Sequence, residues 1–253
     1  LFTEPYMVSY LLDNTLGAWW ACRWLTEDDL MNAKDEQELR LKASLPGMKL
    51  EYLRFVRCDN GKWTPAAGTF AGWPGRLADF LIMDPCCGSG HFLVAALLML
   101  VAMRIKLDCL PARMAVDAVL QENLHGLEID RLCVELAAFN LALTAWRYPG
   151  AGGYHQLPDL NLACSGLSIS TSKKDWLALA DEGSNLQLAL EELYQQFKDA
   201  PILGSLIDPV SGLFDGNLLG LNWKDVSPLL ARALSNKSDY EKNEMGVIAQ
   251  GIA

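Results

Sequence analysis

The stretch that most constrains this chain is DPCCGSGHF, residues 84–92, because it places a glycine turn between two apolar segments. The apolar run ADFLIM precedes it, and a longer apolar run, residues 92–103, follows. Small residues between a strand and a helix leave backbone N–H groups exposed at the helix start, where a ligand can approach them closely. The stretch therefore predicts a strand over Phe80–Met83, a ligand-binding turn and a helix over His91–Leu107.

The next segments continue the alternation of helix and strand. A second helix is predicted over residues 111–122, and LHGLEID, residues 124–130, predicts a short strand that ends in acids. Apolar residues at helical spacing predict a helix over Arg131–Trp146, and LNLACSGLSI, residues 160–169, predicts a third strand. This order is typical of a doubly wound parallel sheet, in which we expect the carboxyl ends of the first two strands to lie side by side.

The residues before this core predict helices and a loop. Thr3 or Glu4 can cap a first helix, and Pro5 suits its first turn. The charged stretch 26–42 predicts one solvated helix, and the stretch 58–75, rich in Gly, Pro and Trp, predicts a loop.

Helices are also predicted after the core. The pattern from Asp175 onward is helical, with a loop through LGSLIDPVSG and a last helical stretch around residues 225–237. We therefore divide the chain into an N-terminal helical segment and loop (1–75), a ligand-binding α/β core (76–170) and a helical insert (171–253).

The charge balance limits how this chain can contact nucleic acid. Its 21 Lys and Arg residues against 31 Asp and Glu residues give a net charge of −10. This excludes the basic surface of an autonomous DNA binder. Any DNA binding must therefore come from a local basic patch or from protein outside these residues.

Cysteine usage and hydropathy indicate the compartment. The seven cysteines contain no CxxC pair and the three histidines are scattered, so we expect no metal site and reduced thiols in a cytoplasmic protein. The apolar run 92–103 is about half the length needed to span a bilayer, and no signal peptide is visible. We expect no membrane segment.

The glycine turn does not match a dinucleotide-binding site. Gly88 and Gly90 give GxG, but the third glycine position of GxGxxG is Leu93. An acid at Asp84 would repel a phosphate and suits a ligand that carries an ammonium group.

The end of the second predicted strand completes the description of the ligand. Glu128 stands where an acid hydrogen-bonds ribose hydroxyls in sheets of this kind, and Ile129 can lie against an adenine ring. The ligand so described has an amino-acid end, a ribose and a purine, and S-adenosylmethionine has all three.

These residues resemble a known family. DPCCGSGHFL resembles the S-adenosylmethionine-binding motif of adenine-N6 DNA methyltransferases, usually D-P-A-C-G-S-G-x-F-L, and GLEID resembles the acidic motif that follows it. The N-terminal stretch FTEPYMVSYLLDNTLG resembles the segment that precedes this fold in the family. The stretch NLACSGLSI resembles the family's third motif, and ILGSLI resembles part of a helical insert. Such an insert is typical of the large single-chain members in type IIG-like restriction-modification and phage-exclusion systems. The resemblance implies a Rossmann-like class I S-adenosylmethionine-dependent methyltransferase sheet, truncated, with added N-terminal and C-terminal helices.

The resemblance also implies a role for each cofactor-binding residue. On the methionine side, Thr3 would contact the carboxylate and Asp84 would bind the amino group. The backbone of Cys86, Gly88 and Gly90 would line the cofactor. Those on the nucleoside side are Glu128 at the ribose and Ile129 at the adenine face. Two positions depart from the family: Cys86 replaces the usual alanine, and Ser165-Gly166 stands where Asp or Asn meets the cofactor's adenine amino group.

The family's catalytic motif, Asn or Asp followed by Pro-Pro and an aromatic residue, is absent, because the chain contains no Pro-Pro pair. We therefore assign no catalytic residue and expect a fragment cut just before that loop, inactive alone and bound to DNA through regions missing from this chain. The parent enzyme would methylate the amino group of adenine in DNA for restriction-modification or phage defence. A nicotinamide-dependent oxidoreductase and a non-catalytic methyltransferase-like binding module remain alternatives.

Overall fold

The computed structural model describes residues 3–68, 72–166, 172–178 and 184–206, with the single residues 180, 208 and 226. The chain forms two compact units, each built from separate segments. Unit 1 comprises Leu1–Ile82, His91–Leu124 and Asn140–Leu160, and unit 2 comprises Met83–Gly90, His125–Phe139 and Asn161–Ala253. The three-part division of the sequence stays a prediction.

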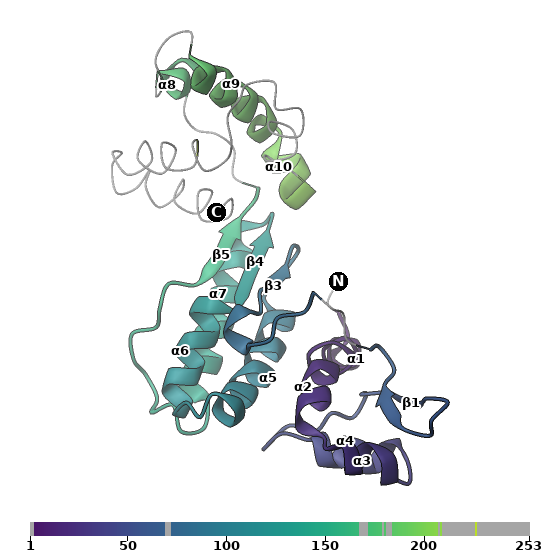
Figure 1. The fold of residues 1–253 in the computed structure, drawn as a ribbon. Helices are drawn as coiled ribbons and strands as arrows, with labels where there is room; N and C mark the ends of the chain where they lie inside the picture. Colours follow the sequence, from purple (N-terminus) through teal and green to yellow (C-terminus); the bar gives the residue numbers. More distant parts are fainter. Residues whose placement is uncertain are drawn as a thin grey trace. The chain divides into compact units, whose positions relative to one another are not determined.

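A small parallel sheet lies at the centre of the α/β pattern. Its strands, in spatial order, are β3 (Ile82–Asp84), β4 (Leu124–Glu128) and β5 (Asn161–Cys164). Strands β4 and β5 are parallel, with Glu128 opposite Cys164, and the three arrows in Figure 1 point the same way. The fold is therefore mixed α/β with a parallel sheet, as predicted. Strand β3 begins at Ile82 rather than at Phe80, because the preceding residues form a 3-10 turn, η1 (Leu77–Asp79).

The helices between these strands match their predicted ranges to within one residue. They are α5 (His91–Leu107), α6 (Ala112–Glu122) and α7 (Arg131–Arg147). Helix α5 packs against α6, and its side chains from Leu93 to Met103 are apolar on all sides, which suits a buried helix. In the described ranges no helix combines the length and the hydrophobicity needed to cross a membrane.

The N-terminal part of unit 1 differs from the prediction in two places. Its elements are α1 (Pro5–Asn14), α2 (Leu16–Trp24), α3 (Glu27–Asn32), α4 (Glu36–Ala43), β1 (Phe55–Arg57) and β2 (Trp63–Pro65). The charged stretch is two helices, not one, because Thr26 caps α3 and Asp35 caps α4. The stretch predicted as a loop contains β2, which pairs antiparallel with β1. Helix α1 begins as predicted, with Pro5 in its first turn and Glu4 at its N-cap position, but no side chain makes the expected capping hydrogen bond.

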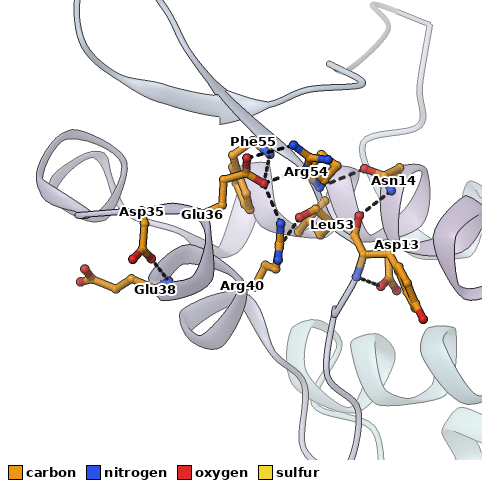
Figure 2. Close-up of polar contacts among 10 residues, drawn as sticks. Asp13, Asn14, Asp35, Glu36, Glu38, Arg40, Leu53, Arg54 and Phe55 are labelled. Atoms are coloured by element: carbon orange, nitrogen blue, oxygen red, sulfur yellow. Dashed lines mark hydrogen bonds and ion pairs between the residues drawn. The ribbon is translucent and has the colours of Figure 1, made fainter.

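The end of α1 holds the segment that leads into β1 (Figure 2). Asp13 Oδ2 accepts the N–H of Tyr52 at 2.9 Å, and Asn14 Oδ1 accepts the N–H of Arg54 at 3.0 Å. The Asn14 side chain also donates to Tyr52 O at 2.8 Å. Glu36 on α4 pairs with the Arg54 side chain at 3.0 Å. Two helices of unit 1 therefore fix the backbone from residue 52 to residue 55.

The C-terminal part of unit 2 is helical where it is described. Its elements are α8 (Lys173–Leu177), α9 (Asn185–Lys198), α10 (Ala200–Leu203) and the 3-10 turn η2 (Gly204–Leu206). Trp176, Leu190 and Leu193 form an apolar cluster between α8 and α9. The helix predicted around residues 225–237 lies outside the described residues, apart from Val226.

Candidate functional site

The turn after β3 contains two glycines with different roles. Gly88 and Gly90 have φ angles of +51° and +82°, a region that favours glycine. A Cβ on Gly90 would lie 3.0 Å from the Cβ of Ala137 on α7, so Gly90 also permits close packing. A Cβ on Gly88 would meet no atom within 4 Å. The backbone at Gly88 therefore borders open space, where a ligand can approach it.

Glu128, at the end of β4, holds this turn. Its Oε2 accepts the N–H of Gly88 at 2.8 Å. Its Oε1 accepts the N–H groups of Ile129 at 2.8 Å and Asp130 at 3.1 Å. A carboxylate offers about four acceptor positions, of which three are in use. Glu128 thus ties the turns after β3 and β4 together, and its negative charge lies at the N–H that a phosphate-binding turn would present.

Asp84 lies half-buried at the end of β3, beside this carboxylate. Burial raises the pKa of Asp84, and the charge of Glu128 raises it further. The Cys86 N–H, which donates to Asp84 Oδ1 at 3.2 Å, acts in the opposite direction. Two carboxylates at one edge of a sheet favour a positively charged group and disfavour an anion.

The adjacent cysteines face different surroundings. Cys86 is exposed, and its Sγ lies 3.7 Å from Ser205 Oγ. Cys87 is buried, and burial together with the charges of Asp84 and Glu128 raises the pKa of its thiol to about 12. Cys87 therefore behaves as a small apolar residue rather than as a nucleophile.

Two glycines from later segments lie close to Ile129, which remains partly exposed. It is 43% exposed, and a Cβ on Gly166 would lie 2.1 Å from its carbonyl oxygen. A Cβ on Gly204 would lie 3.2 Å from Ile129 Cδ1 and 3.3 Å from Ser165 Oγ. Ser165 Oγ is buried and has no hydrogen-bond partner within the described segments. The family resemblance places Ser165-Gly166 at the cofactor's adenine, but Gly204 and Ser205 were missed as neighbours of this site, because their spacing carries no signal for contacts between distant segments.

The structure gathers six of the seven predicted cofactor residues at the turns after β3 and β4. These are Asp84, Cys86, Gly88, Gly90, Glu128 and Ile129, all in unit 2. The expectation that the carboxyl ends of the first two strands lie side by side is confirmed. Thr3 is exposed, lies just before α1 and belongs to unit 1. For the part of the chain that is described, no group of three or more His, Cys, Asp or Glu side chains could hold a metal ion.

Comparisons with known proteins point to one group. Residues 67–151 match the DNA-methyltransferase domain family of MmeI. The adenine-specific methyltransferase PglX of Lacticaseibacillus casei (strain Zhang) is 27% identical over 222 residues, which cover 87% of this chain. The adenine-specific methyltransferase BrxX of Escherichia coli O9:H4 (strain HS) is 27% identical over 145 residues, or 57% of this chain. The matched regions span 17% of PglX and 10% of BrxX.

Proposed function

Because the chain is related to large adenine-specific DNA methyltransferases of the phage-exclusion type, we propose that it carries the S-adenosylmethionine-binding part of such an enzyme. The fold class implied is the Rossmann-like methyltransferase sheet. One observation carries the proposal: the Gly88 N–H donates to the carboxylate of Glu128, close to a second carboxylate, Asp84.

This arrangement favours a cationic cofactor over a dinucleotide. In a nicotinamide site the glycine-turn N–H groups bind a pyrophosphate, which carries negative charge. Here Glu128 occupies such an N–H, and Asp84 adds a second negative charge. Burial, and to a lesser degree the charge of Glu128, raise the pKa of Asp84, and an amino group beside this carboxyl group would offset both effects. The oxidoreductase alternative is therefore disfavoured.

Each residue then has a role that its position supports. The half-buried Asp84 binds the cofactor's amino group, and the backbone at Cys86, Gly88 and Gly90 forms the wall of the site. Ile129 exposes an apolar side chain for the adenine ring, and Glu128 has one acceptor position left for the ribose. Thr3 is proposed for the methionyl carboxylate by family resemblance alone.

The proposed reaction transfers a methyl group to the amino group of adenine in DNA. S-adenosylmethionine, when bound, supplies the methyl group on a positively charged sulfur. The 253 residues contain no Pro-Pro pair, so they lack the loop that holds a flipped adenine in related enzymes. The net charge of −10 gives no general attraction for a phosphate backbone. We expect this chain alone to give only background methylation in an assay with labelled cofactor, and a longer protein that includes it to methylate adenine.

Titration calorimetry with the 253-residue chain tests the cofactor assignment. S-adenosylmethionine and its demethylated product should bind more tightly than NAD. Asp84→Asn keeps an oxygen that can accept the Cys86 N–H but removes the charge. Loss of one charge-assisted hydrogen bond corresponds to about 1.5–3 kcal/mol, so binding should weaken roughly ten- to a hundredfold.

Glu192→Gln, at an exposed position on α9, is the control for a change in net charge and should bind like the parent. Glu128→Gln tests the second carboxylate, with thermal unfolding as a check because Gln cannot satisfy all three backbone donors. Equal binding by Asp84→Asn and the parent, or preference for NAD, would reject the proposed site. Cofactor binding without methylation by the longer protein would favour the binding-module alternative.

A further inference from the structure

Unit 1 contains a cavity that the proposed methyltransferase chemistry does not use. Its volume is about 510 Å³, within the range of small-molecule sites. Its apolar lining comes from Leu12, Met48, Ala95, Leu98 and Met99. Its polar lining comes from Ser9, Asp13, Lys49, Glu51 and Tyr52. The lining thus combines apolar side chains with two carboxylates and one lysine.

Asp13 is the most constrained polar group of this lining. Only 5% of its surface is exposed, which is rare for a carboxylate without a cationic partner. Its Oδ2 accepts the Tyr52 N–H at 2.9 Å, and Oδ1 makes no hydrogen bond to any described residue. Burial and the nearby Glu51 raise the pKa of Asp13, the Tyr52 N–H and Arg40 lower it, and together these effects bring the pKa to about 6. The cavity therefore contains a buried carboxylate that forms no ion pair with any described residue.

We propose that this cavity binds an aliphatic ammonium group, with Asp13 as its counter-ion and the side chains of Leu12 and Met99 along its hydrocarbon chain. A single open oxygen suits a compact ammonium, since a guanidinium would need both carboxylate oxygens for its paired hydrogen bonds. A metal ion does not fit, because one buried carboxylate supplies too few ligands. The proposal does not depend on the methyltransferase assignment.

The chain's own Lys49 does not take this place. Lys49 lines the cavity but is exposed, and it forms no ion pair with Asp13 in the structure. It can still compete for the site in solution. Removing its charge should therefore leave binding of an added amine unchanged or strengthen it.

Methyl NMR of the protein labelled at methionine tests the proposal directly. Addition of n-pentylammonium chloride should shift the signals of Met48 and Met99, and n-pentanol and pentanoate at the same concentration should not. Asp13→Asn should weaken the binding about tenfold or more, because a charge-assisted hydrogen bond is lost. Asp59→Asn removes the same charge at an exposed turn and should bind like the parent. Lys49→Gln should bind at least as well as the parent.

The source of the ammonium group is resolved by a second ligand. Nα-acetyl-lysine-N-methylamide represents a protein lysine, and n-pentylammonium represents a free amine; tighter binding of either identifies the source. Equal shifts in the parent and in Asp13→Asn would overturn the proposal. So would equal shifts with n-pentanol, or no shift with either ammonium compound. None of these outcomes involves S-adenosylmethionine, so they cannot be confused with failure of the cofactor site.

Discussion

Replacing Asp13 by asparagine should stabilise the protein above pH 6 and leave its stability unchanged near pH 4. Burial raises the pKa of Asp13 from 3.8 to about 6. Between these values the folded state holds more protons than the unfolded state, so stability falls as pH rises through this window. Above about pH 6 the loss of stability caused by the ionised Asp13 is constant, and below pH 3.8 this loss vanishes. Asparagine cannot ionise, and its side-chain oxygen can still accept the Tyr52 N–H.

The size of the effect follows from the two pKa values. The difference between about 6 and 3.8 corresponds to about 3 kcal/mol at roughly 1.4 kcal/mol per pH unit. Asp13 borders a cavity that water can enter, so this figure is an upper limit, and we expect about 1–3 kcal/mol. This is a large share of the roughly 5–15 kcal/mol that stabilises a folded domain. A buried carboxylate that destabilises the folded protein by this amount agrees with a binding role.

Urea unfolding from pH 4 to pH 8 at constant ionic strength measures the effect. Tryptophan fluorescence is a suitable probe, since six described tryptophans lie in unit 1: Trp19, Trp20, Trp24, Trp63, Trp73 and Trp146. The free energy of unfolding of Asp13→Asn, minus that of the parent, should rise from near zero at pH 4 to its plateau above pH 6. Asp59→Asn should show no such rise. A constant difference across the range, or a destabilised Asp13→Asn at pH 7.5, would refute the reasoning.

Two further predictions concern the glycine turn and a buried histidine. Gly90→Ala should destabilise the protein by roughly 2–5 kcal/mol in urea unfolding, because residue 90 has a positive φ and the new Cβ would clash with Ala137. Gly88→Ala also has a positive φ but no such contact, so it should destabilise the protein by only about 1–2 kcal/mol. Equal losses of stability in the two variants would contradict the packing argument. The hydrogen bonds to Asp117, at 3.0 Å, and to Gly153 O raise the pKa of His155. The protonated His155 side chain therefore stabilises the folded protein fully below about pH 6.5, and this stabilisation is lost as pH rises through the folded-state pKa of His155. In urea unfolding, Asp117→Asn should lose this pH dependence of stability. An unchanged pH profile in Asp117→Asn would exclude the His155–Asp117 interaction as the cause.

The helices of the core could be predicted because their signals are local. The apolar run of α5 directly follows the glycine turn, and Pro111 sets the start of α6. The start of β3 could not be predicted, because a distant residue decides it. Asn123 donates to the carbonyl oxygens of Leu77 and Phe80, both at 2.7 Å, and so holds this backbone outside the sheet ladder.

The two errors in the N-terminal part have different causes. The break between α3 and α4 had local signals, since Thr26 and Asp35 each precede an acid by three residues, as helix caps do. The high charge of the whole stretch hid them. Strand β2 had no such signal: it depends on pairing with β1 and on the Trp63 indole N–H, which donates to Ala33 O at 3.0 Å.

The position of the candidate site residues at strand ends could be predicted from the sequence, but the backbone donors that Glu128 binds could not. The hydrogen bonds that Glu128 already accepts limit how it can bind the ribose of the proposed cofactor. Glu128 has one acceptor position left, and a ribose presents two hydroxyl groups. Binding both requires Glu128 to release a backbone donor, and we expect it to release the Gly88 N–H, since Ile129 and Asp130 adjoin Glu128 in the chain.

The released N–H would then be available to a hydrogen-bond acceptor on the bound ligand. S-adenosylmethionine should therefore shift the Gly88 amide signal in NMR more than the signals of Ile129 and Asp130. Asp84→Asn should reduce the fraction of protein shifted at a given cofactor concentration without altering the shift at saturation. If the Gly88 amide signal does not move on saturation, Glu128 does not bind both ribose hydroxyls. Its carboxylate would then serve to hold the two turns together.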